Sequence, residues 1–277
     1  MADAQALEKT ERFQSSKNDQ GKLKAITPQW LLRLLSPIII LILWQLASMS
    51  GLLSSRTLAS PLEIAATASR LLMSGELATS LAVSFLRVLA GFSIALVIGI
   101  ALALLAGLSR IGEAIIDPPV QMLKAMPFLG LLPLFILWYG IGEAPKIGMV
   151  AFGSLFPIYL TLYGGIRSVD RKLIEAGRTL DLSTIDIIRH IIIPGAMPSL
   201  LVGIRYGLSI AWLSLVVAEQ INASSGIGYI LTYARDFLQT DVIVVCLLVY
   251  ALMGLLTDGL VRAIETYSLR WRPAVVS

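Results

Sequence analysis

The sequence predicts an all-α fold, a polytopic membrane bundle of about six transmembrane helices, and two observations carry that prediction. First, 56% of the 277 residues are hydrophobic and only 14% are charged, whereas soluble domains usually carry about 25% charged residues. Second, the apolar residues form blocks that approach the roughly 20 residues a helix needs to cross the hydrocarbon layer. A membrane β-barrel would alternate in polarity over segments of about 10 residues, and the stretch from Gly91 to Gly107 does not alternate.

The chain opens with a polar tail, residues 1–30, followed by a transmembrane domain over residues 31–277. The tail mixes acidic and basic residues without an apolar core, which is not the pattern of a cleavable signal peptide. The first predicted span, Leu34 to Met49, is short, and we expect Pro37 to break it. It gains length if Trp30 to Leu35 extends it as an interfacial helix.

Five further apolar segments are expected to span the membrane: Arg87 to Gly107, Val120 to Tyr139, Ile147 to Ile166, Ser199 to Glu219 and Val242 to Val261. Before the second span, Pro61 predicts the start of a short helix on the outer face, because proline suits the first turn of a helix. Pro127 and Pro133 are expected to bend the third span. The single cysteine, Cys246, lies in the last apolar segment and cannot form an internal disulfide.

Lysine and arginine residues collect on alternate connections, which predicts the orientation because positive flanks are retained in the cytoplasm. The basic residues of the expected cytoplasmic side are Lys9, Arg12, Lys17, Lys22, Lys24 and Arg33, then Arg167, Arg171, Lys172, Arg178 and Arg189, then Arg262, Arg270 and Arg272. The opposite connections contain chiefly Arg56, Arg70, Lys146 and Arg235. Both termini are therefore expected to be cytoplasmic, and six spans satisfy that parity.

The connection between the fourth and fifth spans, residues 168–197, has the pattern of two short helices rather than of a linker. Ser168 or Asp170 can cap the first helix. Ser183, with an aspartate three residues later, resembles a capping box for the second helix, which we expect Pro194 to end. The two helices would project from the cytoplasmic face as a knob for a partner's groove. Its apolar anchors would be Leu173, Ile174, Leu180 and Leu182.

Seven residues of this loop have the spacing of a known motif: Glu175, Ala176, Gly177, Asp181, Ile191, Ile193 and Pro194. They resemble the cytoplasmic loop of ABC importer permeases, whose motif is Glu-Ala-Ala, three residues, Gly, nine residues, Ile, any residue, Leu and Pro. The resemblance implies that the loop docks into a cleft of the ATP-hydrolysing subunit, with Ala176 and Gly177 allowing close approach to that partner. Gly177 stands where alanine is usual. Asp181 stands where a left-handed glycine is usual, a conformation that aspartate tolerates better than most residues.

The wider sequence, over roughly Ser60 to Arg272, is similar to the aliphatic sulfonate, taurine and nitrate branch of these permeases. The segments that carry the similarity include Gln121-Met-Leu-Lys-Ala-Met-Pro, Phe156-Pro-Ile-Tyr and Ala218-Glu-Gln-Ile-Asn-Ala-Ser-Ser-Gly-Ile-Gly. The similarity implies a type I importer fold in the bacterial inner membrane and translocation of aliphatic sulfonates, or else of taurine, nitrate or another small organic solute. It also implies ATPase subunits that bind the ATP, an outer solute-binding protein, surrounding membrane lipid and a permease homodimer.

Charged residues within spans are costly and often line transport pathways. Arg87 and Arg205 either line a path for an anion or extend to the interface from near the ends of their spans. Glu219, at the outer end of the fifth span, either forms a structural pair or acts in gating. In the family that the sequence resembles, bends such as those expected at Pro127 and Pro133 accompany the pathway, and the alternative is a packing kink.

The sequence favours no catalytic or metal site and no cofactor of its own. His190 is the only histidine, and it shares one short polar helix with Ser183 and Asp186, without the strand, turn and helix context of a hydrolase. No Gly-x-x-x-x-Gly-Lys-Ser/Thr is present, so ATP is expected on the partner subunit. The basic residues border apolar blocks, which does not favour a nucleic-acid partner. An ion-coupled secondary transporter is the alternative of another class, although its expected midmembrane carboxylates are nearly missing.

Overall fold

The computed structural model describes residues 29–54 and 57–269, and all regular secondary structure within those ranges is helical. In chain order the helices are α2 (Gln29–Met49), α3 (Pro61–Met73), α4 (Glu76–Leu108), α5 (Arg110–Ala125), η1 (Phe128–Leu131), α6 (Leu132–Tyr139), α7 (Glu143–Arg167), α8 (Arg171–Thr179), α9 (Thr184–Ile187), η2 (Ile188–Ile192), α10 (Ile193–Asn222), α11 (Ile227–Asp236) and α12 (Thr240–Ser268). The all-α prediction is confirmed. Most of the predicted polar tail, together with Arg56, Arg270 and Arg272, lies outside the described residues.

Two compact units divide the chain, residues 1–62 and residues 63–277. In the first unit, α2 continues through Pro37, so the prediction that this proline breaks the helix is wrong. A proline removes one backbone hydrogen bond, which apolar membrane helices tolerate better than soluble ones do. The segment Leu35–Met49 of α2 is apolar and shorter than the candidate spans of the second unit.

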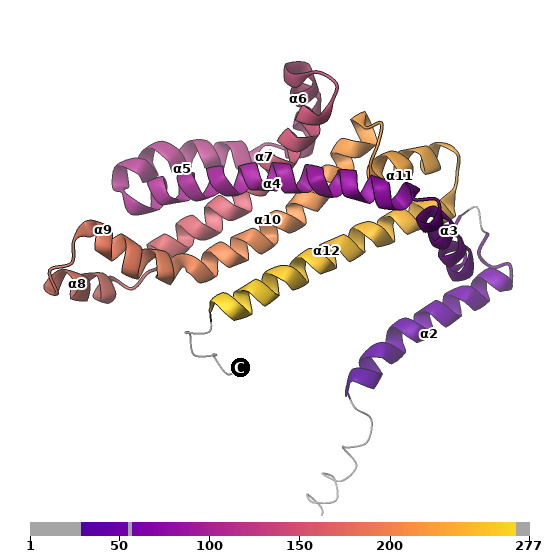
Figure 1. Cartoon of the computed structure of the whole chain (residues 1–277), viewed down its shortest axis with the longest axis horizontal. Helices are drawn as coiled ribbons and strands as arrows, with labels where there is room; N and C mark the ends of the chain where they lie inside the picture. Colours follow the sequence, from indigo (N-terminus) through magenta and orange to yellow (C-terminus); the bar gives the residue numbers. More distant parts are fainter. Residues whose placement is uncertain (1–28, 55–56, 270–277) are drawn as a thin grey trace, which may run out of the picture. The chain divides into compact units, whose positions relative to one another are not determined.

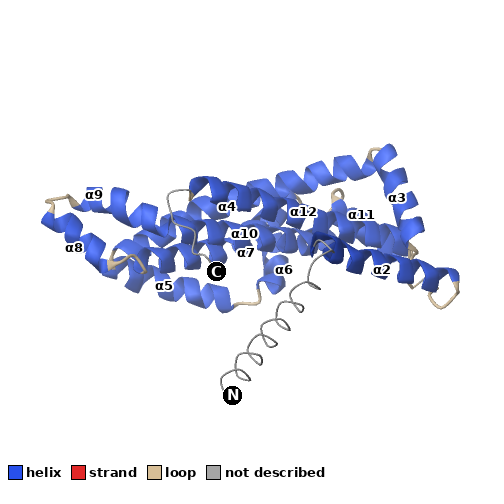
Figure 2. Cartoon of the chain, turned by 90° about the horizontal axis from the view of Figure 1, so that it is seen from below, coloured by secondary structure: helices blue, strands red, loops and turns tan. Residues whose placement is uncertain are grey.

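In the second unit, α7 packs between α4 and α10 and has its most extensive contacts with these two helices (Figures 1 and 2). Glycines at eight-residue intervals on α4 allow the close approach of α7. A Cβ added at Gly91 would lie 2.6 Å from Val150 Cβ, and one added at Gly99 would lie 2.9 Å from Ile158 Cγ2. Small residues are typical of helix contacts in membranes, where backbones approach closely and gain dispersion energy. The α4–α7–α10 layer is therefore the core of this unit.

The predicted third span is not one helix. The chain turns by 87° between α5 and the η1–α6 segment, because Pro127 holds the preceding Met126 in an extended conformation (φ −70°, ψ 141°). Pro133 lies in the first turn of α6 and bends nothing, since that position leaves no backbone hydrogen bond unmade. The expected bend is confirmed at Pro127 and is wrong at Pro133.

Four helices in the described part of the chain are long and apolar enough to cross a membrane: α4, α7, the joined α9–η2–α10 and α12. They extend beyond the predicted bounds at both ends. The bent α5–α6 pair makes a fifth if it counts as one span. The described residues thus contain four candidate spans, or five with the bent pair, together with the shorter apolar helix Leu35–Met49, in agreement with the predicted polytopic bundle; the number of six spans stays a prediction. Pro61 begins α3, as the sequence predicts.

Candidate functional site

The loop between α7 and α10 forms two short helices joined by a tight turn, as the sequence predicts. The Oδ1 atom of Asp170 accepts a hydrogen bond from Lys172 N at 2.9 Å and caps α8. Ser183 caps α9 by accepting from Asp186 N at 3.2 Å, and its hydroxyl donates to Asp186 Oδ2 at 2.5 Å. Of the two capping residues that the sequence offered for α8, the structure selects Asp170. Side-chain caps of this kind fix where each helix begins.

The turn after α8 has the geometry that the importer motif assigns to glycine. Asp181 has φ of 55°, in the left-handed region. Leu182 N donates to Gly177 O at 3.1 Å, and Asp181 N donates to Arg178 O at 3.0 Å, which is the paired hydrogen-bond pattern of a Schellman motif. The expectation of a left-handed backbone at Asp181 is confirmed.

Gly177 makes its close contact inside the chain. It is buried, and a Cβ added there would lie 2.8 Å from Ile191 Cδ1 and 3.4 Å from Ile187 Cγ1. The prediction that Gly177 lets a partner approach is therefore wrong. Its lack of a side chain instead allows α8 to pack on the α9–η2 segment, which places Ile191 of the motif beneath α8.

The second short helix does not end at Pro194. Helix α9 continues through η2 into α10, and Pro194 lies in the first turn of α10. The η2 segment is a π-helix, in which Ile193 N donates to Ile188 O. A π-turn is wider than an α-helical turn, and this one directly precedes Pro194. It makes room for the proline ring, which would otherwise crowd the carbonyl of His190. The expected break is wrong, and the outcome is one continuous candidate span from Thr184 to Ile221.

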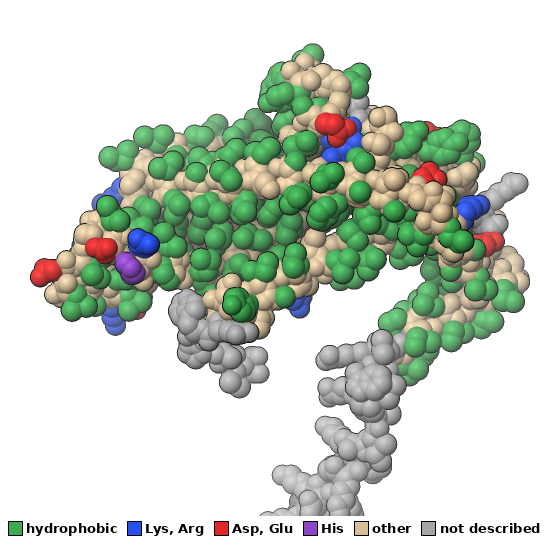
Figure 3. All heavy atoms as spheres, in the orientation of Figure 1, with side chains coloured by type: hydrophobic (Ala, Val, Ile, Leu, Met, Phe, Trp, Pro, Cys, Tyr) green, Lys and Arg blue, Asp and Glu red, His purple; other side chains and the backbone are tan. Residues whose placement is uncertain are grey.

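The outer face of α8 presents the remaining motif residues to solvent. Glu175 and Ala176 are exposed, and two predicted anchors beside them, Leu173 and Leu180, are 56% and 75% exposed. Ile193 is also partly exposed, at 39%. The loop lies at one end of the second unit (Figure 1), where acidic and basic side chains gather on the surface (Figure 3). An exposed apolar patch held on a capped, prefolded knob is typical of a protein-docking surface.

A cluster of four charged residues joins α4, α7 and α10 of the second unit; Arg87, Lys146 and Glu219 are buried, whereas the Glu143 side chain is 55% exposed. Arg87 of α4 is 3% exposed and uses its guanidinium on three partners. Its Nε donates to Glu143 Oε2 at 2.5 Å and its Nη1 donates to Glu219 Oε1 at 2.6 Å. Nη1 also donates to Ser225 O at 2.7 Å, and Nη2 to Glu143 Oε1 at 2.7 Å. Lys146 donates to the same Glu143 oxygen at 2.9 Å. Two cations and two carboxylates thus form a neutral group.

Glu219 is the centre of this cluster on α10, and its side chain is 0% exposed. Besides Arg87, it accepts hydrogen bonds from Ser84 Oγ at 2.8 Å and Gly228 N at 2.9 Å, and from Tyr250 Oη at 3.2 Å. The carboxylate therefore ties α10 to α4, to the start of α11 and to α12. A buried carboxylate is stable only when it is paired and hydrogen-bonded in this way.

In this structure Glu219 forms the structural pair that one of its two interpretations expects, whereas Arg87, at 3% exposure, does not extend to the interface; a gating role for Glu219 stays a prediction. Both side chains are enclosed and paired with one another, so in this structure neither lines a path for an anion. The sequence did not indicate Glu143 as a partner of Arg87, and it placed Lys146 only among the charges of a connection. A glutamate in the first turn of a helix with a lysine three residues later is a recognisable local signal. The link to Arg87, however, spans 56 residues and has no local pattern.

Arg205 forms a separate ion-paired group between α10 and α12. Its Nη2 donates to Glu265 Oε2, and its Nε lies 3.4 Å from Asp258 Oδ1. The side chain is 27% exposed. Arg205 can be reached from outside the chain, but two carboxylates already balance its charge. Within the described residues, no three His, Cys, Asp or Glu side chains are grouped so that they could hold a metal ion.

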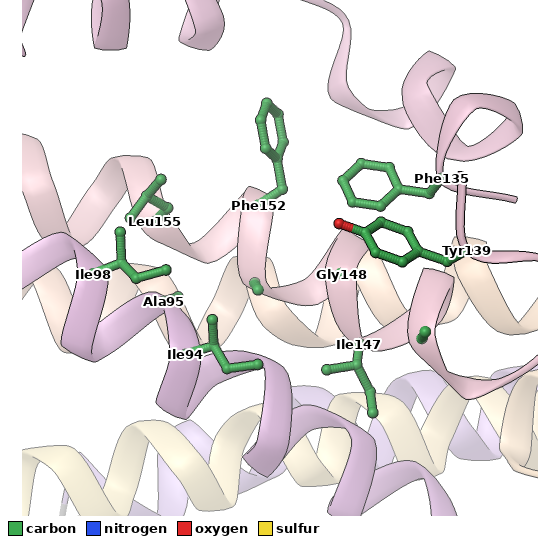
Figure 4. A pocket seen from close by; sticks show the side chains of 11 residues that line it. Ile94, Ala95, Ile98, Phe135, Tyr139, Ile147, Gly148, Phe152 and Leu155 are labelled. Carbon is green, nitrogen blue, oxygen red and sulfur yellow. The ribbon is translucent and has the colours of Figure 1, made fainter. Parts of the chain in front are cut away.

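The bend at Pro127 positions α6 against α7 and creates an apolar pocket of about 510 Å³ between α4, α6 and α7 (Figure 4). Phe135 of α6 packs on Gly148, where an added Cβ would lie 2.8 Å from its ring. The rings of Phe135 and Tyr139 stack with centroids 6.1 Å apart, and the Tyr139 hydroxyl is the only oxygen among the labelled side chains. The pocket offers no charged group to an anion.

Comparison with known proteins places these features in context. The model of the family described as binding-protein-dependent transport system inner membrane component matches residues 95–266. The aliphatic sulfonates transport permease protein SsuC of Escherichia coli (strain K12) is 49% identical over 249 residues, which cover 89% of this chain and 95% of that protein. SsuC of Bacillus subtilis (strain 168) is 42% identical and covers 88% of both chains. The taurine transport system permease protein TauC of E. coli (strain K12) is 33% identical, covering 73% of this chain and 74% of that one.

Two solved structures share the fold at low sequence identity. One, an amino acid ABC transporter with histidines, has a TM-score of 0.59 at 19% identity, covering 72% of this chain and 97% of that one. The other, the MetNI methionine ABC transporter in an inward-facing conformation, has a TM-score of 0.51 at 22% identity, covering 68% and 94%. Their likeness supports the arrangement of helices and no more.

Proposed function

This chain belongs to the family of binding-protein-dependent transport system inner membrane components, and from that premise we propose that it imports aliphatic sulfonates. The family makes it the membrane permease subunit of an ABC importer, and ATP hydrolysis belongs to a separate subunit, so the chain is not an enzyme. Membership also rules out the ion-coupled secondary transporter. An ATPase and a substrate-binding protein are the partners that the family implies.

The observation that carries the substrate proposal is the similarity to two permeases named for aliphatic sulfonates, at 49% and 42% identity over most of each chain. The taurine permease, at 33%, is named for a solute that also bears a sulfonate group. A sulfonate-bearing solute is therefore the substrate class we favour over nitrate or another small organic solute. The paired arginines described above leave recognition of the anion to the binding protein outside.

We further propose that two copies of this chain form the pathway and that α8 and α9 lie on the cytoplasmic side. The basic residues in and around α8, α9 and η2 support this orientation, since positive flanks are retained in the cytoplasm. Both termini would then be cytoplasmic as well. The large apolar side chains exposed along α4 and α12, such as Leu86, Leu105, Leu248 and Leu255, suit contact with lipid or with a second copy.

The exposed face of α8 is our proposed docking surface for the ATPase, with Glu175 and Ala176 at its centre. The continuous helix that follows α8 offers a route by which a displacement of α8 would reach the membrane. The candidate span from Thr184 to Ile221 has 38 residues and is about 57 Å long at 1.5 Å per residue. Because Gly177 packs on Ile191, a displacement of α8 would move this helix directly. The helix ends beside the Glu219 cluster, which would pass the movement to α4 and α7.

Growth on different sulfur sources tests the substrate proposal. A strain of the native host that lacks this chain should fail to grow on an alkanesulfonate as its only sulfur source and should grow normally on sulfate. A plasmid copy of the chain should restore growth, and the same plasmid carrying no insert is the control. Normal growth of the deletion strain on the sulfonate, in a host with no second such permease, would refute the proposed substrate.

A further inference from the structure

A basic pocket of about 380 Å³ lies where α4 and α7 end and where α8 and α9 begin. Arginines from three elements line it: Arg110 at the start of α5, Arg167 at the end of α7, and Arg171 and Arg178 on α8. The docking face of α8 described above does not include them. The pocket is separate from the buried Arg87 cluster, which lies near the start of α7.

Three of these arginines lack a counter-charge. Arg167 donates to Glu113 at 2.6 Å. Arg110, Arg171 and Arg178 are exposed and make no ion pair or side-chain hydrogen bond with residues in the described ranges. Asp170, the neighbour of Arg171, caps α8, and Glu113, three residues from Arg110, pairs with Arg167. Glu175 and Asp181, each three residues from Arg178, form no ion pair with it within the described residues. Guanidinium groups remain charged at any physiological pH, so three unbalanced positive charges face one pocket.

The floor of the pocket is apolar. Ile166 and Ile187 are buried, at 6% exposure each, and Ile174 and Ile192 also line it. A ligand that satisfies both surfaces needs an anionic group and an adjoining apolar part. The pocket has the volume of roughly a dozen liquid waters at about 30 Å³ each. A small free anion would leave the isoleucine floor uncovered.

Leu108 and Arg167, the last residues of the candidate spans α4 and α7, line the pocket. These helices have 33 and 25 residues, about 50 and 38 Å at 1.5 Å per residue, against about 40 to 45 Å for a bilayer with its headgroups. With both helices spanning the membrane, the pocket therefore falls in or just beside the headgroup region. With the proposed orientation, this is the cytoplasmic leaflet, whose anionic lipids attract clustered lysine and arginine. The inference rests on that orientation.

We propose that this pocket binds the phosphate headgroup of an anionic phospholipid of the cytoplasmic leaflet. The three free arginines hold the phosphate through bidentate, charge-assisted hydrogen bonds, and the isoleucine floor contacts the adjoining glycerol and upper acyl carbons. A lipid in this position anchors the base of α8 to the membrane surface, beside the loop that we propose docks the ATPase.

Lipid titration of the purified full-length chain in a neutral detergent tests the proposal, independently of any transport. The probes are dioctanoyl phosphatidylglycerol, which is anionic, and dioctanoyl phosphatidylcholine, which is not. We expect the triple variant Arg110→Gln, Arg171→Gln and Arg178→Gln to lose about 100-fold in phosphatidylglycerol affinity. This figure corresponds to about fivefold, or about 1 kcal/mol, for each arginine. Arg189→Gln is the matched control, because Arg189 is exposed on the same loop and does not line the pocket.

The proposal is supported if the wild-type chain and Arg189→Gln bind phosphatidylglycerol more tightly than phosphatidylcholine and the triple variant does not. If the triple variant aggregates, Arg178→Gln alone carries the test, with a fivefold loss in support and unchanged affinity against. Competition by inorganic phosphate at concentrations as low as those of phosphatidylglycerol would overturn the proposal in favour of a free anion. Unchanged lipid affinity with loss of ATPase co-purification would overturn it in favour of a protein contact.

Discussion

Replacing Glu219 by glutamine should destabilise the protein strongly, because it removes the charge at the centre of the buried cluster. The substitution nearly preserves the side-chain shape. It places an amide group, which donates hydrogen bonds, where one carboxylate oxygen accepts them. The groups that now donate to Glu219 include Arg87 at 2.6 Å, Gly228 N at 2.9 Å and Tyr250 at 3.2 Å, so at least one of them would lose its acceptor.

The expected magnitude follows from the burial of both charges, with exposures of 3% for Arg87 and 0% for Glu219. Removing one partner of a buried ion pair costs about 3 to 5 kcal/mol, because the other charge remains buried and uncompensated. At about 2 to 4 °C for each kcal/mol in a protein of this size class, the Tm should fall by about 6 to 20 °C. Glu143 keeps part of the Arg87 charge balanced, which favours the lower half of that range.

The assay is thermal unfolding of the purified chain in detergent, followed by intrinsic tryptophan fluorescence. Arg235→Gln is the control, because Arg235 forms an exposed pair with Asp236 at 3.2 Å, and such pairs contribute about 0 to 1 kcal/mol. The double variant Arg87→Gln with Glu219→Gln should lose less than the sum of the single variants, since the two groups interact directly. A Tm for Glu219→Gln within the range of Arg235→Gln would refute the structural role of the cluster.

Two further predictions concern the loop. Gly177→Leu should destabilise the loop by about 1 to 3 kcal/mol through overpacking, because the new Cβ would lie 2.8 Å from Ile191. Ala176→Leu, on the exposed face of α8, should leave the Tm unchanged and weaken co-purification of the ATPase. Equal Tm values for these two variants would contradict the internal role of Gly177. Asp181→Gly should raise the free energy of unfolding by about 1 kcal/mol or less and preserve uptake, because glycine adopts a φ of 55° without strain. A clear fall in Tm would show that the aspartate side chain has another role.

Local signals in the sequence were sufficient to predict where each short helix of the loop begins. Asp170 and Ser183 cap the two short helices because a short polar side chain can reach the free N–H groups of the turn that follows it. Asp181 adopts the left-handed conformation because it occupies the motif position that requires it. The caps depend on residues within three positions of one another, which a single sequence contains, whereas the expectation at Asp181 came from the resemblance to the importer motif.

Features that depend on the neighbouring helices were not predictable in this way. Pro194 is accommodated within a continuous helix because a π-turn precedes it, and Pro127 forms a right-angled break rather than a mild bend. Gly177 faces α9 rather than a partner, since nothing in its own sequence context shows which surface covers it. The pairing of Arg87 with Glu219 joins residues 132 positions apart, and only the packing of α4, α7 and α10 brings them together.

Reconstituted uptake tests whether this chain is the pathway of an ATP-driven sulfonate importer. The chain would be purified with its ATPase, placed in proteoliposomes, and supplied with the solute-binding protein and a radiolabelled alkanesulfonate. We expect uptake that requires ATP and the binding protein. Unlabelled sulfonate should compete with it, nitrate should not, and Ala176→Leu should reduce it. Uptake without ATP, or ATP-dependent uptake of nitrate in place of the sulfonate, would contradict the proposed function.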